Sequence, residues 1–231
     1  LHLCDRRQRQ MCIRDSHDMI KDTIAAHKRI IFNGNGYSDE WVAEAERRGL
    51  PNIKCMVDAV PALVKPEAVE IFEKHGVYTK AEMESRAEVM YETYSKTINI
   101  EALTMIDMAK KQIVPATIKY QTSLAESVNA IKAASSAVDT SVQEALMADI
   151  STNLKDMYVA LAHLEEVAGK AEAMEEGAEQ GHYYHDVVFT AMDELRKPAD
   201  KLEMLVAKSA WPFPSYGDLI FEVQDRETEW V

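Results

Sequence analysis

The feature that most constrains the fold is an apolar stripe at helical spacing that runs through the middle of the chain. Its members recur about every 3.7 residues over roughly 50 residues, close to the 3.6 residues per turn of an α-helix. The stripe comprises Met83, Ala87, Met90, Tyr94, Ile98, Ala102, Met105, Ala109, Ile113, Ala116, Tyr120, Leu124, Val128 and Ile131. A strand cannot hold this pattern, because its side chains alternate with a period of two. The sequence therefore predicts one very long helix.

The beginning and one irregularity of this helix can also be predicted. Thr79-Lys80-Ala81-Glu82 has the pattern of a capping box, in which a hydroxyl and a glutamate satisfy each other's backbone donors. Pro115 removes a backbone donor and crowds the preceding turn. We therefore expect the helix to start at Thr79 and to kink near Lys111.

Two further apolar stripes follow, separated by polar or glycine-containing joints. The first ends at Gly169, and the second follows a Gly- and Glu-rich joint at residues 170–181. Their members are Val142, Leu146, Ile150, Leu154, Met157, Leu161, Leu164 and Ala168, and then Val188, Met192, Leu195, Ala199, Leu202 and Val206. Three long helices with short connections pack most simply as an antiparallel bundle, which we predict over residues 79–210.

Before the bundle, residues 17–78 are punctuated by glycine and proline and predict short helices. A helical pattern over residues 17–32 is interrupted at Asn33. Ser38 is a predicted N-cap, followed by Asp39 and Glu40, whose charge suits the positive end of a helix.

Two more short helices are expected in this region. The first of these two, after the helix capped by Ser38, begins at an Asp58 cap and runs into Pro61. The second has Pro66 in its first turn and ends at His75-Gly76. The predicted fold class is therefore all-α, with short helices followed by a long antiparallel bundle.

The two ends of the chain differ from the rest. Residues 1–16 show no helical or strand period, and the string RRQRQMCIRDS resembles translated sequencing-adapter DNA. We expect an artefactual segment there, with a disordered basic tail as the alternative. Residues 211–231 begin with Trp-Pro-Phe-Pro and predict an extended aromatic tail that lies against another part of the protein.

Charge and composition exclude several classes of protein. The 231 residues carry 26 basic and 39 acidic side chains, a net charge of −13. Sequence-independent nucleic-acid binding draws on Lys and Arg, and anionic membranes repel acidic surfaces, so neither partner is expected. No apolar run reaches the 18 residues of a spanning helix. Only Cys4, Cys12 and Cys55 occur, without metal-ligand spacing, which favours a reducing, cytoplasmic location.

One half of a metal-binding pattern is present. Glu179-x-x-His182 places a carboxylate and an imidazole on one helix face, as in di-iron bundles. Such a site needs a second copy, which the sequence lacks, and the other stripes present Met, Leu and Ala. We expect no metal site, and we expect His163, His182 and His185 to have packing or surface roles.

The segment Asn33-Gly34-Asn35-Gly36-Tyr37 is a second candidate site. Two glycines beside two short amides allow a backbone to approach a ligand closely. The segment lacks a preceding strand and the spacing of a nucleotide-binding fingerprint. A turn that caps the following helix is the simpler interpretation.

Three ordered segments carry a resemblance to a known family. They are residues 29–41, RIIFNGNGYSDEW; residues 96–108, KTINIEALTMIDM; and residues 211–219, WPFPSYGDL. Together they resemble the C-terminal part of type III glutamine synthetase, and the resemblance covers residues 17–231. It implies an enzyme that joins ammonia to glutamate with ATP through a γ-glutamyl phosphate, using Mg or Mn, in stacked hexameric rings.

The resemblance also implies what is missing. The family's metal-ligating glutamates and histidine and its phosphate-binding arginines would lie upstream of His17, so we expect a fragment that is itself inactive. In the family, an Asn-Gly-Ser-Gly motif at the glutamate site is followed by a histidine. In this chain the similar Asn33-Gly34-Asn35-Gly36 is followed by Tyr37-Ser38-Asp39 instead. No catalytic, cofactor-binding or metal-binding residue is therefore assigned. The motif residues of unassigned role are Asn33, Gly34, Asn35, Gly36, Tyr37, Glu40 and Trp41.

The expected partners of this fragment are its own catalytic domain, adjoining residues 17–78, and further copies of the enzyme. A stand-alone helical interaction protein is the main alternative to a synthetase fragment, and a di-iron bundle is a weaker one. Residues that continue the chain upstream of Ser16 would distinguish them, because only the first interpretation predicts a catalytic domain there.

Overall fold

A computed structural model describes residues 2–31 and 33–221. These residues form helices and connecting turns without any strand, so the predicted all-α class is confirmed. Residues 1 and 32, and the part of the predicted tail at 222–231, lie outside the described residues. The chain divides into two compact units, Leu1–Ile53 and Lys54–Val231, and each is treated by itself below.

The first unit holds two helices and a short 3₁₀ turn. Helix α1 spans His2–His27, the turn η1 spans Lys28–Ile30, and helix α2 spans Asp39–Arg47. The expectation of no regular structure in residues 1–16 is wrong for residues 2–16, which are helical. Side chains 12–27 are all exposed, so α1 makes no core contact through them. Whether residues 1–16 are artefactual stays a prediction.

Two short helices open the second unit. Helix α3 spans Met56–Leu63 and helix α4 spans Pro66–Lys74. Pro66 occupies the first turn, and Gly76, with a φ of 63°, follows the end of α4, as predicted. The predicted cap at Asp58 is wrong, because α3 starts earlier and Asp58 lies inside its first turn.

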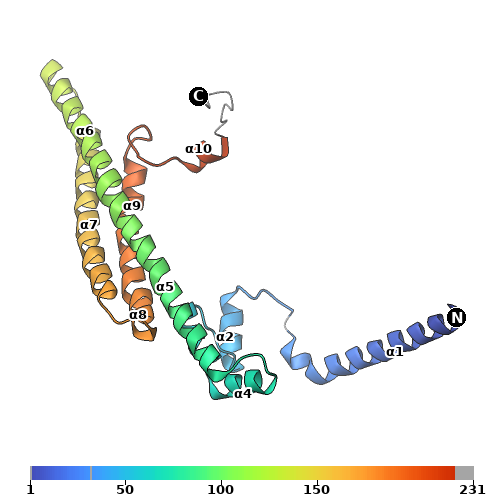
Figure 1. Cartoon of the computed structure of the whole chain (residues 1–231). Helices are drawn as coiled ribbons and strands as arrows, with labels where there is room; N and C mark the ends of the chain where they lie inside the picture. Colours follow the sequence, from blue (N-terminus) through green and yellow to red (C-terminus); the bar gives the residue numbers. More distant parts are fainter. Residues whose placement is uncertain (1, 32, 222–231) are drawn as a thin grey trace, which may run out of the picture. The chain divides into compact units, whose positions relative to one another are not determined.

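The long predicted helix is present but contains a π-helical segment. It consists of α5 (Lys80–Met108), the π segment η2 (Ala109–Ile113) and α6 (Val114–Ala134), which follow one another as a continuous rod (Figure 1). The Thr79 capping box is confirmed, with the Thr79 N–H donating to Glu82 Oε2 at 2.8 Å. The π segment lies where a kink near Lys111 was predicted, and its wider turn spares Pro115 the clash with the carbonyl four residues before it.

The buried face of α5 departs from the predicted stripe by one residue. Met90 is 40% exposed, whereas Tyr91 and Ser95 are buried in its place. Likewise Thr117 is buried instead of Ala116. A tyrosine ring and two small hydroxyl residues therefore belong to the core face, which apolar periodicity alone does not reveal.

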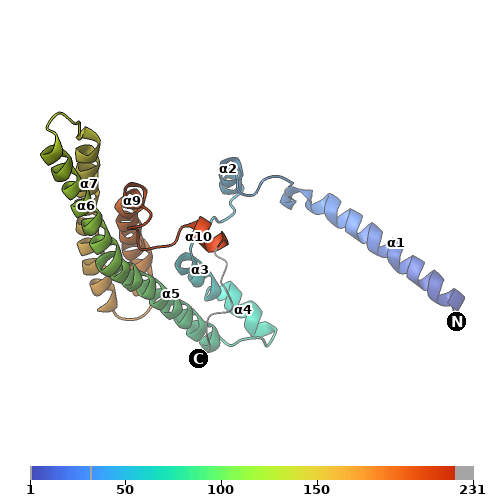
Figure 2. The same cartoon turned by 90° about the horizontal axis from the view of Figure 1, so that it is seen from above.

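The remaining helices complete an antiparallel arrangement. Helix α7 spans Ser141–Glu172, α8 spans Ala178–Tyr183, the π segment η3 spans Tyr184–Val188, and α9 spans Phe189–Leu205. In Figures 1 and 2, α7 returns alongside α6, and α8 to α9 then run back alongside α7. Gly169 does not end α7 as predicted, because the helix continues to Glu172, and the turn comes at Gly177 with a φ of 141°.

The chain after the bundle is only partly extended. Trp211 and Phe213 are half-buried against the core, as expected of an aromatic segment. Residues Tyr216–Phe221 form a short helix, α10, where an extended tail was predicted. The Ser215 N–H donates to Asp218 Oδ2 at 2.8 Å and Asp218 N–H donates to Ser215 Oγ at 3.3 Å, a reciprocal cap that explains the helix.

The main core lies between the three long rods and is built from all three predicted stripes. Its fully buried members include Ala102, Ile150, Met157, Leu161, Leu164, Val188, Leu195 and Leu202. A smaller cluster joins Val57 and Val60 of α3 to Ala87 and Tyr91 of α5. Because this cluster ties α3 to α5, the second compact unit begins at Lys54, just before α3. Among the described residues, no helix is both long and apolar enough to cross a membrane.

A close approach at Gly181 holds α8 against the start of the bundle. A Cβ atom at this position would lie 3.1 Å from Cδ1 of Tyr91 and 3.3 Å from Cγ1 of Val57. These distances are shorter than ordinary carbon contacts, so a side chain here would push α8 away from both α5 and α3. Glycine is needed for this packing although its backbone is an ordinary helix.

We predict that Gly181→Val destabilises the protein by about 1–3 kcal/mol, since overpacking a core contact costs that much. The midpoint of urea unfolding measures the change. Gly169→Ala is the matched control, because Gly169 is also helical and nothing lies within 4 Å of the added methyl group. That control should be neutral or stabilising by up to about 1 kcal/mol. Equal losses in both variants would contradict the prediction.

Candidate functional site

The glycine and asparagine segment forms an exposed turn in the first unit. The Tyr37 backbone N–H donates to Oδ1 of Asn35 at 3.0 Å, which closes the turn locally. The residues 33–37 are all exposed, and the Tyr37 side chain is 99% exposed. The turn therefore presents a phenol and two amides to solvent without surrounding walls.

The turn leads directly into the cap of α2. Ser38 Oγ accepts a hydrogen bond from the Trp41 backbone N–H at 3.3 Å, which confirms the predicted N-cap. A backbone hydrogen bond, and then one with Ser38, lower the pKa of Glu40. Both carboxylates of the first turn, Asp39 and Glu40, lie at the positive end of the helix. These contacts account for the segment as a turn that starts a helix.

An ion-pair cluster secures the far end of α2. Arg47 donates to Glu44 from Nε at 2.6 Å and from Nη2 at 2.5 Å, and Arg48 donates to it from Nε at 2.6 Å. The hydrogen bonds from Arg47, followed by those from Arg48, lower the pKa of Glu44 to about 2. Arg48 also donates to the Arg29 carbonyl at 3.1 Å, and its guanidinium lies 5.8 Å from the Trp41 ring centroid.

Arg48 is the residue of this region whose role was missed in the sequence. It joins the turn after α1 to the aromatic residue of the motif and to Glu44. Its spacing of four residues from Glu44 was an available signal, since i and i+4 side chains meet on a helix. The longer link to Arg29 has no local sequence signal.

The proposed half-motif for metal binding does not gather ligands. His182 Nδ1 lies 3.8 Å from Asp58 Oδ1, and His185 Nδ1 lies 2.8 Å from Asp186 Oδ1, whereas Glu179 is exposed. Within residues 2–31 and 33–221, no group of three His, Cys, Asp or Glu side chains is placed to hold a metal ion. The arrangement lends no support to a di-iron site.

One tyrosine ring lies near each of the two histidines, and Tyr91 fastens α3 to the bundle. The Tyr91 hydroxyl donates to the Val57 carbonyl at 3.4 Å, and its ring centroid lies 6.5 Å from that of His182. Tyr94 and His185 have the same ring separation. Burial, and then the neighbouring Cys55, raise the pKa of Tyr94 to about 12. A phenol that stays protonated and packed is suited to a structural role.

The contacts described above are all structural, so the chain is an acidic, helical domain without a catalytic centre among its described residues. Residues 15–132 match the family described as the glutamine synthetase C-terminal domain, and the chain belongs to this family. The resemblance seen in the sequence is confirmed.

Three curated relatives extend the match beyond the family domain. A glutamine synthetase of Butyrivibrio fibrisolvens is 38% identical over 207 residues, which cover 90% of this chain. A type-3 glutamine synthetase of Dictyostelium discoideum is 29% identical, and a glutamine synthetase of Bacteroides fragilis is 30% identical, each over 88% of this chain. The matched region spans only 28–30% of the relatives' own lengths.

The lowered pKa of Glu44 makes the ion pairs at the end of α2 dependent on pH. Because the pKa falls from 4.5 to about 2, this contribution to stability is present above pH 4.5 and is lost as the pH falls toward 2. We predict a carboxyl titration midpoint near 2 by NMR. It should move toward 4.5 in Arg47→Gln and in 1 M salt, which screens exposed charges. A midpoint that neither change moves would contradict this assignment.

Proposed function

We propose that this chain is the C-terminal portion of a type III glutamine synthetase, an enzyme that ligates ammonia to glutamate with ATP through a γ-glutamyl phosphate. The observation that carries the proposal is the match of 207 residues, nearly the whole chain, to a glutamine synthetase at 38% identity. Such a match includes the short helices and the bundle, so it does not rest on a single motif.

The portion described here has no catalytic role in this proposal. Phosphoryl transfer to a carboxylate needs metal ions and positive groups that converge on the phosphates. The exposed segment 33–37 itself contains no cationic side chain, and Arg47 and Arg48 are engaged by Glu44. The described residues do not fit a nucleotide or metal site. ATP and Mg or Mn would bind in the remaining part of the parent enzyme.

The function left to this portion is to form contacts. Apolar side chains remain exposed along the bundle, among them Ile100, Leu103, Ile118, Tyr158 and Val159. Exposed apolar surface of this kind is typical of interaction sites. We propose that the bundle contacts the catalytic domain and further copies in a homo-oligomer of stacked hexameric rings. The net charge of −13 disfavours a nucleic-acid or anionic-membrane partner, and we place the parent enzyme in the cytoplasm as part of this proposal.

We predict that this chain alone has no ligase activity, whereas a longer protein from the same reading frame, extended upstream, forms γ-glutamyl hydroxamate from glutamate, hydroxylamine and ATP. The full-length Butyrivibrio fibrisolvens relative serves as the positive control. Glutamine formation by the chain alone would refute the non-catalytic role. A start codon directly before His17, without an upstream domain, would favour a stand-alone interaction protein.

A further inference from the structure

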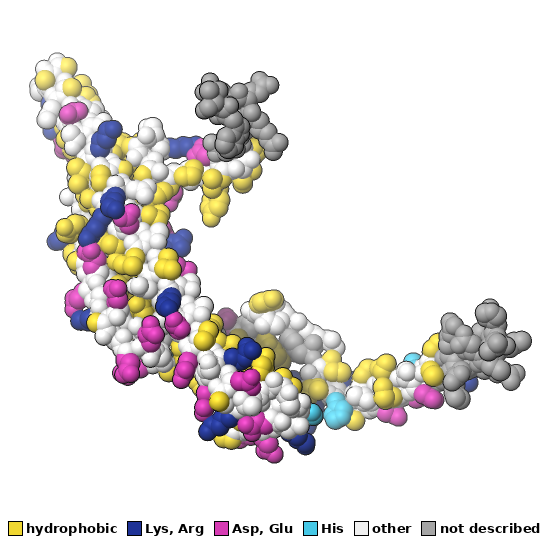
Figure 3. All heavy atoms as spheres, viewed as in Figure 1, with side chains coloured by type: hydrophobic (Ala, Val, Ile, Leu, Met, Phe, Trp, Pro, Cys, Tyr) yellow, Lys and Arg dark blue, Asp and Glu magenta, His cyan; other side chains and the backbone are white. Residues whose placement is uncertain are grey.

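The turn before α2 contains two Asn-Gly pairs, Asn33-Gly34 and Asn35-Gly36, for which the proposed function has no use. All residues from 33 to 37 are exposed. In Figure 3 the chain between α1 and α2 is a narrow band of mostly white atoms, as expected of glycine and asparagine. An asparagine followed by glycine can modify itself, because no Cβ atom keeps the glycine nitrogen away from the asparagine side chain.

The two asparagines of this turn differ in how they are held. The Tyr37 N–H donates to Asn35 Oδ1 at 3.0 Å, and the Ser38 N–H donates to the Asn35 backbone carbonyl at 3.4 Å. The ring closed by the first hydrogen bond contains both Asn35 Cγ and the Gly36 backbone nitrogen, so it keeps these two atoms close together. Within residues 33–221, no backbone N–H donates to the Asn33 side chain.

The surroundings of Asn35 also suit an attack of the Gly36 nitrogen on Asn35 Cγ. Negative charge would develop on Asn35 Oδ1 during this attack, and the Tyr37 N–H already donates to that oxygen. The Gly36 N–H makes no hydrogen bond among the described residues, so the nitrogen is free to lose its proton. A Cβ atom added at Gly36 would meet nothing within 4 Å, so the site is open to water.

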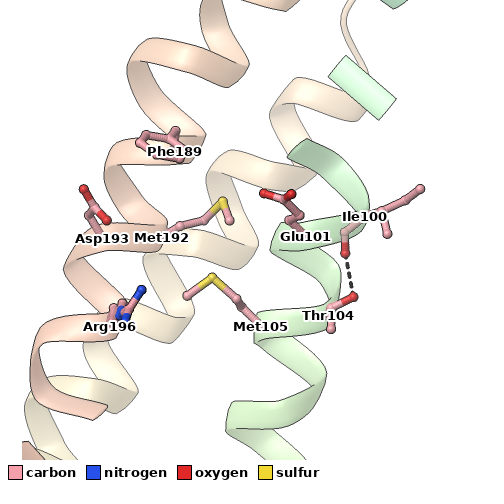
Figure 4. A pocket seen from close by; sticks show the side chains of 8 residues that line it. All are labelled: Ile100, Glu101, Thr104, Met105, Phe189, Met192, Asp193 and Arg196. Atoms are coloured by element: carbon pink, nitrogen blue, oxygen red, sulfur yellow. Dashed lines mark hydrogen bonds between the residues drawn. The ribbon is translucent and has the colours of Figure 1, made fainter. Parts of the chain in front are cut away.

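Asn99, in α5, is in the opposite situation. The residue after it is Ile100, whose carbonyl accepts a hydrogen bond from the Thr104 hydroxyl at 2.7 Å on a regular helical turn (Figure 4). Inside a helix the backbone N–H groups are engaged by carbonyls one turn earlier. The branched side chain of Ile100 also crowds its own nitrogen. Asn99 is therefore an internal reference that should react slowly.

We propose that Asn35 is a site of self-modification, which the folded chain converts into aspartate and isoaspartate faster than it converts Asn33. The Gly36 nitrogen loses its proton and forms a bond to Asn35 Cγ. The bond from Cγ to the side-chain nitrogen breaks, and this nitrogen takes up a proton and leaves as ammonia. Water, the only co-reactant, then opens the cyclic imide at either carbonyl, which gives aspartate or isoaspartate.

The modification acts on the start of α2. Both products place a carboxylate shortly before Asp39 and Glu40, which already carry negative charge in the first turn of the helix. In isoaspartate the main chain runs through the former side chain, so the chain is longer by one carbon atom just before the Ser38 cap. The two hydrogen bonds that close the turn then lose their geometry. This inference is independent of the proposed ligase function.

Mass spectrometry of the full 231-residue chain tests the proposal. The chain is incubated at mildly alkaline pH, and tandem spectra of its peptides follow the replacement of each asparagine amide by a carboxyl group. We expect Asn35 to react about two- to tenfold faster than Asn33, which is the effect of one hydrogen bond on a rate. Asn99 should react most slowly. In urea, where the turn is lost, Asn35 and Asn33 should react at similar rates.

Two substitutions of the donor residue separate its backbone from its side chain. Tyr37→Pro removes the N–H and should slow Asn35 to the rate of Asn33. Tyr37→Phe is the matched control, because it keeps the N–H and alters only a side chain that is 99% exposed, so the rate should not change. Gly36→Ala should slow Asn35 alone.

Equal rates at Asn35 and Asn33 in the folded chain would overturn the proposal. A rate ratio that neither urea nor Tyr37→Pro changes would also overturn it, because the difference would then not come from the folded turn. Neither outcome bears on the proposed synthetase function, which is tested by hydroxamate formation.

Discussion

Burial of helix α7 between the two neighbouring rods is the interaction on which the rest of the second unit depends. Its residues Ile150, Met157, Leu161 and Leu164 are almost completely buried, and they meet side chains from both α5–α6 and α9. Burial of side chains of this size contributes about 1.5–3 kcal/mol each before entropy is counted. The short helices can therefore be attached to a bundle that is already formed, through Val57 and Tyr91 and the space left by Gly181.

The sequence allowed the bundle to be predicted because its signals are local or periodic. The capping box at Thr79, the proline in the first turn of α4 and the Ser38 cap all act within a few residues, so each was correct. The misses come from contacts that are not local. Tyr91 is buried because α3 and α8 pack on it, and nothing in its own neighbourhood distinguishes it from Met90. Gly169 sits inside α7 because tertiary packing outweighs its helix propensity.

The candidate site was predictable in its chemistry but not in its connections. The turn and cap around Asn35 and Ser38 follow from residue type, and the exposed carboxylate of Glu179 follows from polarity. The hydrogen bond from Arg48 to the Arg29 carbonyl joins segments nineteen residues apart, and no local pattern in the sequence shows that these segments meet. The approach of His182 to Asp58 depends in the same way on how α3 meets α8.

The two π-helical segments, η2 and η3, have a consequence for how such a bundle can change length. An extra residue in an α-helix rotates everything beyond it by about 100°, which would turn the apolar face toward water. A π turn takes up one surplus residue within a single turn and restores the phase of the face. The α5–α6 rod and the α8–α9 rod thus each accommodate one surplus residue at their π segment, so the rods can differ in residue count and still present matched faces to α7.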